Sequence, residues 1–189
     1  MTRGAILDEA GRLASQVGLE GLTIGSLASQ TQLSKSGLFA HFGSKESLQL
    51  EVLEHAAERF TAEVVRPALR APRGEPRVRA LFERWLEWGS APGGCLFVAA
   101  DFELDDRPGP VRERLVRSQR DWLDTMAMVF ASGVTEGHFR RDADPHQFAQ
   151  DLFGVMLAFH VSHRLLGDPE APARARRALE NLLAAAAAG

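Results

Sequence analysis

Apolar residues recur at helical spacing along almost the whole chain, and this periodicity constrains the fold more than any other feature of the sequence. The first apolar face is made by Ile6, Leu7, Ala10, Leu13, Ala14 and Val17. Residues three or four positions apart lie on one side of a helix, and Gly18 then predicts a left-handed end for it. The sequence has almost no strict alternation of apolar and polar residues, the pattern typical of strands. We therefore predict an all-α fold of about nine helices.

Three polar residues mark the starts of the next three helices. Thr23 and Ser34 precede two short apolar segments, and their hydroxyl groups are suited to accept hydrogen bonds from the first free amides of a helix. Ser44 precedes a longer helix, in which an apolar residue recurs every fourth position until Pro67, and we expect this proline to break or kink it. The first part of the chain is therefore predicted to hold three helices and the start of a long linking helix.

Loop signals divide the remainder of the chain. The stretch "RPALRAPRGEP" at 66–76 is rich in proline, and "GSAPGG" at 89–94 ends the helix that follows it. Proline opens a later helix at Pro110, and an Asp-Pro pair opens one more at Asp144 and the last at Asp168. We expect a helix-turn-helix domain over 1–48, a linking helix over 44–66 that begins within it, and a second helical domain over 49–189.

Composition and charge exclude several classes of protein. The chain has 189 residues, 45% of them apolar, which favours a packed core over disorder. Its longest nearly uncharged apolar segment begins at Leu152 and is about half of the roughly 20 residues that a membrane span needs. No secretion signal is visible, and the single cysteine, Cys95, cannot form an internal disulfide. We expect a soluble, cytoplasmic protein that does not bind membranes.

The sequence gives little support for an enzyme, a cofactor or a metal site. It has no tyrosine, no glycine-rich nucleotide loop and no convincing acid–base or nucleophile group. His160 and His163, three positions apart, have the spacing of two ligands of one metal, but histidines on such a helix are more often packed or solvated. The acidic run from Asp101 to Asp106 is more typical of a solvated loop end. We assign no catalytic residue, no cofactor and no metal, and we expect apolar neighbours to keep the Cys95 thiol inert.

One segment near the start of the chain is free of negative charge. Residues 21–45 contain two lysines and no carboxylate, although the whole chain has a net charge of −3. A short helix, a turn of about four residues and a second short helix with a serine cap describe a helix-turn-helix, whose second helix enters the major groove of DNA. A phosphate-rich partner explains the missing acids. The start of the next helix, at Ser44 and Lys45, offers a second phosphate site.

The same residues resemble a known family. The segment "TRGAILDEAGRLASQVGLEGLTIGSLASQTQLSKSGLFAHFGSKESLQLEVL" is similar to the N-terminal DNA-binding domain of the TetR family of bacterial transcriptional regulators. The marks, in order, are Gly18, Thr23, Leu27-Ala28, Ser34, Leu38 and a following aromatic residue, His41-Phe42, and Ser44-Lys45-Glu46. The resemblance implies a homodimer, a palindromic operator on double-stranded DNA, and a second domain that binds a small, apolar or amphipathic effector.

The resemblance also assigns roles to individual residues. Lys35, Ser36 and Gly37 match positions that face the base edges, and Thr23, Phe39, His41 and Lys45 match positions that contact the DNA backbone. Phe39 stands where tyrosine is common, which removes a hydroxyl–phosphate hydrogen bond worth about 1 kcal/mol. Gln32 replaces the usual turn glycine, which costs on the order of 1 kcal/mol if its backbone is left-handed.

The second domain has a large supply of aromatic and sulfur-containing side chains. The candidates for an effector pocket are Trp85, Trp88, Phe97, Phe102, Trp122, Met126, Phe130, Met156, Phe159 and His160. Pockets of helical domains lie between helices and are lined by such residues. The alternative for most of them is ordinary core packing, and we expect about a third to touch a ligand.

The last two helices are apolar on more than one face, so that they must bury a second surface. The candidates for a dimer interface are Leu152, Phe153, Val155, Leu179, Leu182 and Leu183. A four-helix interface between two copies would cover them, and the alternative is a larger core within one chain. Together these features predict a ligand-responsive DNA-binding regulator, most simply a repressor. The alternative is a helical ligand- or protein-binding module with weak or lost DNA binding.

Overall fold

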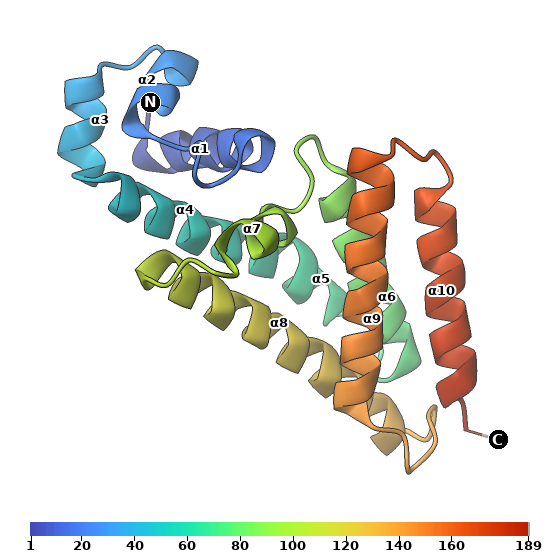
Figure 1. Cartoon of the computed structure of the whole chain (residues 1–189). Coiled ribbons are helices and arrows are strands. Elements are labelled where there is room, and N and C mark those ends of the chain that lie inside the picture. Colours follow the sequence, from blue (N-terminus) through green and yellow to red (C-terminus); the bar gives the residue numbers. More distant parts are fainter. Residues whose placement is uncertain (189) are drawn as a thin grey trace. The chain divides into compact units, whose positions relative to one another are not determined.

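The structure is a computed structural model that describes residues 1–188, and Figure 1 shows it as helices joined by short connections. The α-helices are α1 (Arg3–Val17), α2 (Ile24–Thr31), α3 (Lys35–Phe42), α4 (Lys45–Phe60), α5 (Arg66–Ala68), α6 (Glu75–Ser90), α7 (Leu96–Leu104), α8 (Pro110–Thr135), α9 (Pro145–His160) and α10 (Ala171–Ala186). Two π-helical segments, η1 (Thr61–Val65) and η2 (Val161–Leu165), continue α4 and α9. Residues 1–188 therefore form nine unbroken helical stretches, and their only β-type pairing is an isolated bridge between Phe139 and Ala187. The predicted all-α fold is confirmed.

The chain divides into two compact units. Unit 1 consists of Met1–Phe60 and Ala91–Gln119, and unit 2 consists of Thr61–Ser90 and the rest of the chain from Arg120. Helix α8 supplies residues to both units, because the division falls between Gln119 and Arg120. Packing thus groups the chain differently from the predicted domains 1–48 and 49–189, which are defined by what they bind and stay a prediction.

In unit 1, helix α1 packs against α4 through one apolar face, as its sequence spacing predicts. Ile6, Ala10 and Ala14 are almost fully buried on α1, as are Leu48 and Val52 on α4. Each large apolar side chain that is removed from water in this way stabilises the fold by about 1.5–3 kcal/mol. The α1 face therefore sets the position of α4, whose first turn follows directly after α3.

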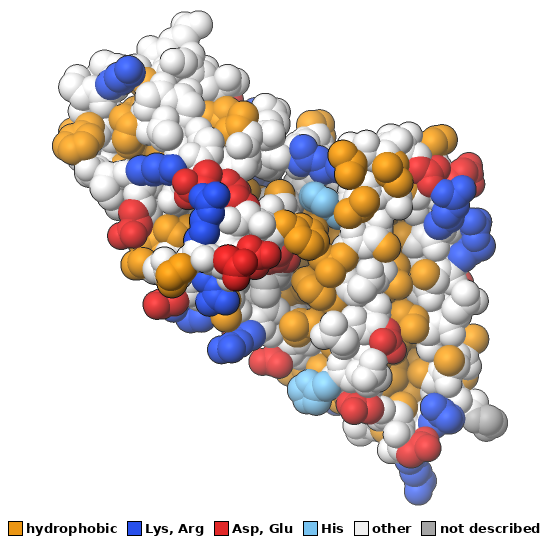
Figure 2. Space-filling model, viewed as in Figure 1, with side chains coloured by type: hydrophobic (Ala, Val, Ile, Leu, Met, Phe, Trp, Pro, Cys, Tyr) orange, Lys and Arg blue, Asp and Glu red, His pale blue; other side chains and the backbone are white. Residues whose placement is uncertain are grey.

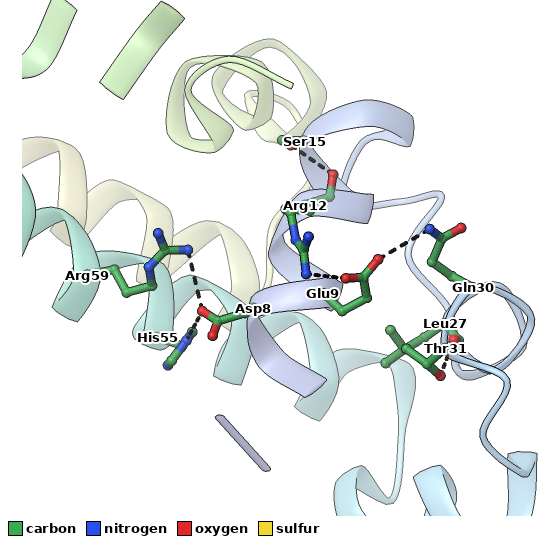
Figure 3. A network of polar contacts seen from close by, with 9 residues as sticks. All are labelled: Asp8, Glu9, Arg12, Ser15, Leu27, Gln30, Thr31, His55 and Arg59. Carbon is green, nitrogen blue, oxygen red and sulfur yellow. Dashed lines mark hydrogen bonds and ion pairs between the residues drawn. The ribbon is translucent and has the colours of Figure 1, made fainter. Parts of the chain in front are cut away.

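Polar contacts at the edge of this packing connect α1 to its neighbours (Figure 3). The Oδ1 atom of Asp8 lies 2.8 Å from His55 Nε2 and 3.4 Å from an Arg59 nitrogen, and both partners come from α4. Glu9 pairs with Arg12 on its own helix and accepts a hydrogen bond of 3.2 Å from Gln30 of α2. Helix α1 is therefore held to both α2 and α4 by side chains as well as by its apolar face.

The long helix that begins as α4 loses its regular hydrogen bonding before Pro67, as predicted. Residues Thr61–Val65 are π-helical, and the helix ends at Ala68. Proline has no N–H to donate to the carbonyl four residues earlier, and its ring crowds that carbonyl, so that the preceding turn must widen or bend.

Unit 2 has an aromatic core. The ring of Phe130 lies between those of Phe139 and Phe148, with centroid distances of 4.3 and 4.1 Å. Trp85 of α6 meets Phe159 of α9 edge to face at 5.6 Å. Such aromatic pairs add about 0.5–1.5 kcal/mol to the stabilisation that comes from burial. Helices α9 and α10 pack side by side (Figure 1).

Two helix ends differ from the prediction. Gly18 ends α1 with a φ of 82° but a ψ of 161°, which is not the left-handed helical conformation. The last helix begins at Ala171 instead of directly after Asp168, because the Asp168 carboxylate accepts a hydrogen bond from the Glu170 amide within a preceding turn. Asp144, in contrast, caps α9 as predicted through the amides of His146 and Gln147.

Within residues 1–188, no helix combines the length and the apolar character that crossing a bilayer requires.

Candidate nucleic-acid interface

Side-chain caps define the helices of the predicted DNA-binding segment. Thr23 Oγ1 accepts a hydrogen bond from the Ser26 amide at 2.9 Å, and Ser26 Oγ accepts one from the Thr23 amide, so that the two residues form a capping box. Ser34 accepts from the Gly37 amide at 3.1 Å and caps α3, and Ser44 accepts from the Ser47 amide at 3.0 Å and caps α4. All three predicted caps are confirmed.

The turn between α2 and α3 depends on a strained residue. Gln32 has a φ of 59° and a ψ of 20°, and it is the only residue other than glycine with a positive φ in the described part of the chain. This left-handed conformation places the Cβ atom close to the next carbonyl oxygen and costs about 1–2 kcal/mol. The condition on which the sequence assigned a cost to Gln32, a left-handed backbone, is therefore met.

Helix α3 buries only a narrow stripe of its surface. Leu38 and Phe42, one turn apart, are 1% and 3% exposed, whereas the other six residues of the helix are exposed. Phe42 is thus a core residue, whereas the Phe39 side chain is 60% exposed and points out of the core. A helix held by one stripe leaves its remaining surface free to enter a groove of DNA.

Arg3 fixes the end of α3, a role that the sequence did not indicate. Its guanidinium donates to the carbonyl oxygen of His41 at 3.2 Å and lies over the Phe42 ring, 5.0 Å from the centroid. The same group pairs with Glu51 of α4 at 2.5 Å. Arg3 therefore connects α1, α3 and α4 at the point where the direction of α3 is set.

The positive charge of this surface comes from two lysines. They lie within residues 21–45, a segment that contains no acidic residue. Lys35 is exposed in the first turn of α3. Lys45 lies in the first turn of α4, and its Nζ atom is 3.0 Å from a carboxylate oxygen of Glu20. Glu20, which directly precedes the acid-free segment, is therefore paired with Lys45, which ends it, and the spacing in sequence did not reveal this contact.

The predicted effector residues are divided between the two units. Phe97 and Phe102 belong to unit 1, and the other eight belong to unit 2. Phe102 is 66% exposed, and both faces of the Phe130 ring are covered by the stacked rings of Phe139 and Phe148. The buried members of unit 2 are Trp85, Trp122, Met126, Phe130, Met156 and Phe159. Trp88 and His160 are half-buried.

The predicted dimer residues also differ in exposure. Leu152, Leu179 and Leu183 are buried within the chain, whereas Phe153, Val155 and Leu182 are half-buried on α9 and α10. The first three therefore serve the core of the single chain, and a partner could reach only the second three directly.

The two histidines at the end of α9 have different surroundings. The His163 ring stacks on Phe159 at 5.1 Å, and burial lowers the pKa of His160, as do Arg164 and His163 to a smaller extent. In the described part of the chain, no group of three histidine, cysteine or carboxylate side chains is arranged to hold a metal ion. Cys95 is 3% exposed.

Two capped helices joined by a tight turn, the second held by a single stripe and free of acids, define a helix-turn-helix DNA-binding protein. A family model described as "Bacterial regulatory proteins, tetR family" matches residues 6–52. A second one, "Tetracyclin repressor-like, C-terminal domain", matches residues 74–179. The chain therefore belongs to the TetR family and is a DNA-binding transcriptional regulator, as the members of this family are, and not an enzyme.

Solved structures share the fold over most of the chain. SCO4454, a TetR-family transcriptional regulator from Streptomyces coelicolor, has a TM-score of 0.82 at 24% identity, over 97% of this chain and 95% of that one. KstR2 of Mycobacterium tuberculosis, a ketosteroid transcriptional regulator, has a TM-score of 0.73 at 19% identity, over 99% of this chain and 95% of that one. AibR, solved with isovaleryl coenzyme A and operator DNA, has a TM-score of 0.69 at 22% identity, over 82% of this chain and 84% of that one. No curated protein matches the sequence.

Proposed function

We propose that this regulator represses transcription as a homodimer on a palindromic operator and that a small molecule releases it from the DNA. The observation that carries the DNA part of this proposal is the geometry of α3, whose Lys35, Ser36 and Gly37 stand exposed directly after the Ser34 cap. These residues would read base edges in the major groove, with the Lys35 ammonium donating to guanine O6 and N7. Residues 1–48 would form the DNA-binding part of the chain.

The proposed backbone contacts surround this helix. Lys45 and the free amides at the start of α4 would bind one phosphate, and His41 and Thr23 would bind others. The Thr23 hydroxyl lies within hydrogen-bonding distance of Ser26 Oγ, at 3.2 Å, so that it would have to turn towards a phosphate on binding. Phe39 would lie against the backbone without the hydroxyl that a tyrosine supplies.

A surface of unit 2 supports the proposed dimer. Hydrophobic side chains gather along the face formed by α9 and α10 (Figure 2). The half-buried Phe153, Val155 and Leu182 lie on these helices, and Leu165 and Leu166 beyond α9 are 79% and 69% exposed. A second copy would remove these side chains from water and would hold two recognition helices about one DNA turn, roughly 34–36 Å, apart. Sedimentation of the wild-type protein tests the dimer.

The proposed effector is small and apolar or amphipathic. The aromatic and methionine side chains of unit 2, among them Trp85, Met156 and Phe159, resemble the lining of apolar ligand sites between helices, with His160 as a polar partner. AibR, which shares the fold, was solved with both isovaleryl coenzyme A and operator DNA, so that a protein of this fold binds both kinds of partner. A coupling free energy of about 1–3 kcal/mol between the two sites would change DNA affinity by about 5- to 150-fold.

Alanine variants of the two lysines test the proposed contacts. Lys35→Ala should relax base preference, because it removes a contact to a base edge. Lys45→Ala should weaken binding to all sequences alike and flatten the dependence of log affinity on log salt by about one unit, because it removes one phosphate contact. Fluorescence anisotropy with duplex fragments from around the gene of this protein, at several salt concentrations, measures both effects.

The control is Arg177→Ala, which removes one positive charge from an exposed position on α10 in unit 2. It should leave both base preference and salt dependence unchanged. If Lys35→Ala and Lys45→Ala have the same effect on every fragment, the division into base and phosphate contacts is wrong. If neither variant differs from Arg177→Ala, this surface does not bind DNA.

A further inference from the structure

The turn between α1 and α2 surrounds the carboxylate of Glu103, which lies near the end of α7. The amide of Leu19 donates to Glu103 Oε2 at 2.8 Å, and the amide of Glu20 donates to Oε1 at 2.6 Å. Gly18 has a positive φ, and a Cβ atom at this position would lie only 2.8 Å from Glu103 Oε1. Consecutive backbone N–H groups arranged in this way form a concave site for an anion. A side chain from α7 therefore occupies a site formed by the α1–α2 turn.

A second side chain holds the same turn from α4. The Nε2 atom of Gln49, which is 4% exposed, donates to the carbonyl oxygen of Leu19 at 2.5 Å. A buried amide of this kind is costly to leave without a partner, so that the contact is strongly specified. The backbone of Glu20 is thus fixed by Glu103 on one side and by Gln49 on the other.

The Glu20 side chain contacts two cations. Its Oε2 atom is 3.0 Å from Lys45 Nζ and 3.2 Å from Arg107 Nη1. The hydrogen bond from Lys45 is the largest cause that lowers the pKa of Glu20. Lys45 is the residue for which we proposed a phosphate contact, and a carboxylate oxygen and a phosphate oxygen offer an ammonium group the same kind of partner.

We propose that Glu20 competes with DNA phosphate for Lys45. Glu103 of α7 and Arg107, in the connection between α7 and α8, position this competitor. The inference rests on the proposed DNA contact of Lys45. To contact Lys45, a DNA phosphate must displace the Glu20 carboxylate. The protein therefore binds DNA more weakly than it would if Lys45 had no acidic partner. Arg107 already touches the same carboxylate oxygen, and Glu20 therefore keeps a partner when Lys45 turns to the phosphate.

An ordinary surface ion pair is the simpler explanation of the contact between Glu20 and Lys45. The two side chains are 42% and 39% exposed, and such pairs contribute little to stability. The two explanations differ in what happens to DNA binding when Glu20 loses its charge. If the pair is purely structural, the loss of the Glu20 charge changes DNA affinity no more than the loss of another exposed acid near the DNA does, whereas the loss of a competitor increases the affinity further.

The test is the DNA affinity of the full-length Glu20→Gln variant on one labelled duplex of arbitrary sequence, over a series of salt concentrations. We expect binding about 1.5- to 5-fold tighter than that of the wild type, the range for an exposed ion pair, and a salt slope steeper by up to about 0.9. The matched control is Glu46→Gln, because Glu46 is exposed next to Lys45 and its loss reports the general effect of removing one acid near DNA. Equal effects of the two variants would overturn the proposal.

The Lys45→Met background separates this inference from the proposed function. If Lys45→Met does not weaken DNA binding, the phosphate contact itself is wrong. If it weakens binding, the gain from Glu20→Gln should fall to that from Glu46→Gln in this background, and a larger gain that persists would refute competition for Lys45. Thermal unfolding of each variant verifies that it is folded.

The part played by Arg107 has its own test. Arg107→Gln should weaken DNA binding, because Glu20 then loses its second cation and pairs more strongly with Lys45. This effect should shrink in the Glu20→Gln background. An equal loss in both backgrounds would mean that Arg107 acts only through its charge and not through Glu20.

Discussion

Replacing Glu103 by alanine should release the turn between α1 and α2. The variant removes both hydrogen bonds from the Leu19 and Glu20 amides to a charged acceptor. Bonds to charged groups contribute about 1.5–3 kcal/mol each, and the Glu20 bond is exposed and is therefore worth less. We expect the free energy of opening the turn to fall by about 2–3 kcal/mol. Amide exchange at Leu19 and Glu20 should accelerate by about 30- to 150-fold.

Native-state hydrogen exchange of the full-length protein, followed amide by amide by NMR, measures this effect where it is expected. The control is Glu58→Ala, which removes an exposed glutamate from α4 in the same unit. Glu103→Gln should have a smaller effect than Glu103→Ala, since one oxygen remains to accept a bond. If Glu103→Ala accelerates these two amides no more than Glu58→Ala does, the carboxylate does not hold the turn.

Two further substitutions test conformational strain and burial. Gln32→Gly should stabilise the protein by about 0.5–1 kcal/mol in urea unfolding, because glycine adopts the left-handed conformation without strain. Gln32→Ala keeps the Cβ atom, so that an alanine variant as stable as the glycine variant would contradict this reasoning. Burial raises the pKa of Asp101 to about 6, although a hydrogen bond from Gln119 opposes the shift. The folded state then binds the proton more tightly than the unfolded chain, so that stability falls as pH rises from about 4 to about 6 and stays lower above that range. Asp101→Asn should therefore raise the melting temperature at about pH 8 and much less at about pH 4, and an equal gain at both pH values would refute the assignment.

Local features of the fold were predictable from the sequence, because their causes lie within a few residues. The caps at Thr23, Ser34 and Ser44 each satisfy an amide three positions away, so that the sequence holds all the necessary information. The left-handed conformation of Gln32 was raised only as a condition, because the resemblance places a glycine at this position of the turn. The start of α10 was predicted too early in the chain, because an aspartate such as Asp168 can cap either a helix or a short turn that precedes the helix.

Contacts between residues far apart in sequence were not predictable in this way. Glu103 and the Leu19 amide are 84 positions apart, and nothing near either residue indicates the other. The acidic run that contains Glu103 looked like a solvated loop end for this reason. Aromatic residues pose a related problem, because a core ring and a pocket ring have the same apolar character and the same helical spacing. Phe130 was a candidate for the pocket, and only the structure places rings on both of its faces.

The division of unit 1 into two separate stretches of chain has a consequence for its biosynthesis. The ribosome completes Met1–Phe60 first, but unit 1 also needs Ala91–Gln119. At the usual ~5–20 residues per second, translation of the roughly 60 residues from Thr61 to Gln119 takes about 3–12 s. Until Glu103 has been added, the Leu19 and Glu20 amides of the nascent chain lack this partner. The helices of Met1–Phe60 are thus made first, but they can reach their final packing only after the chain has been extended to Gln119.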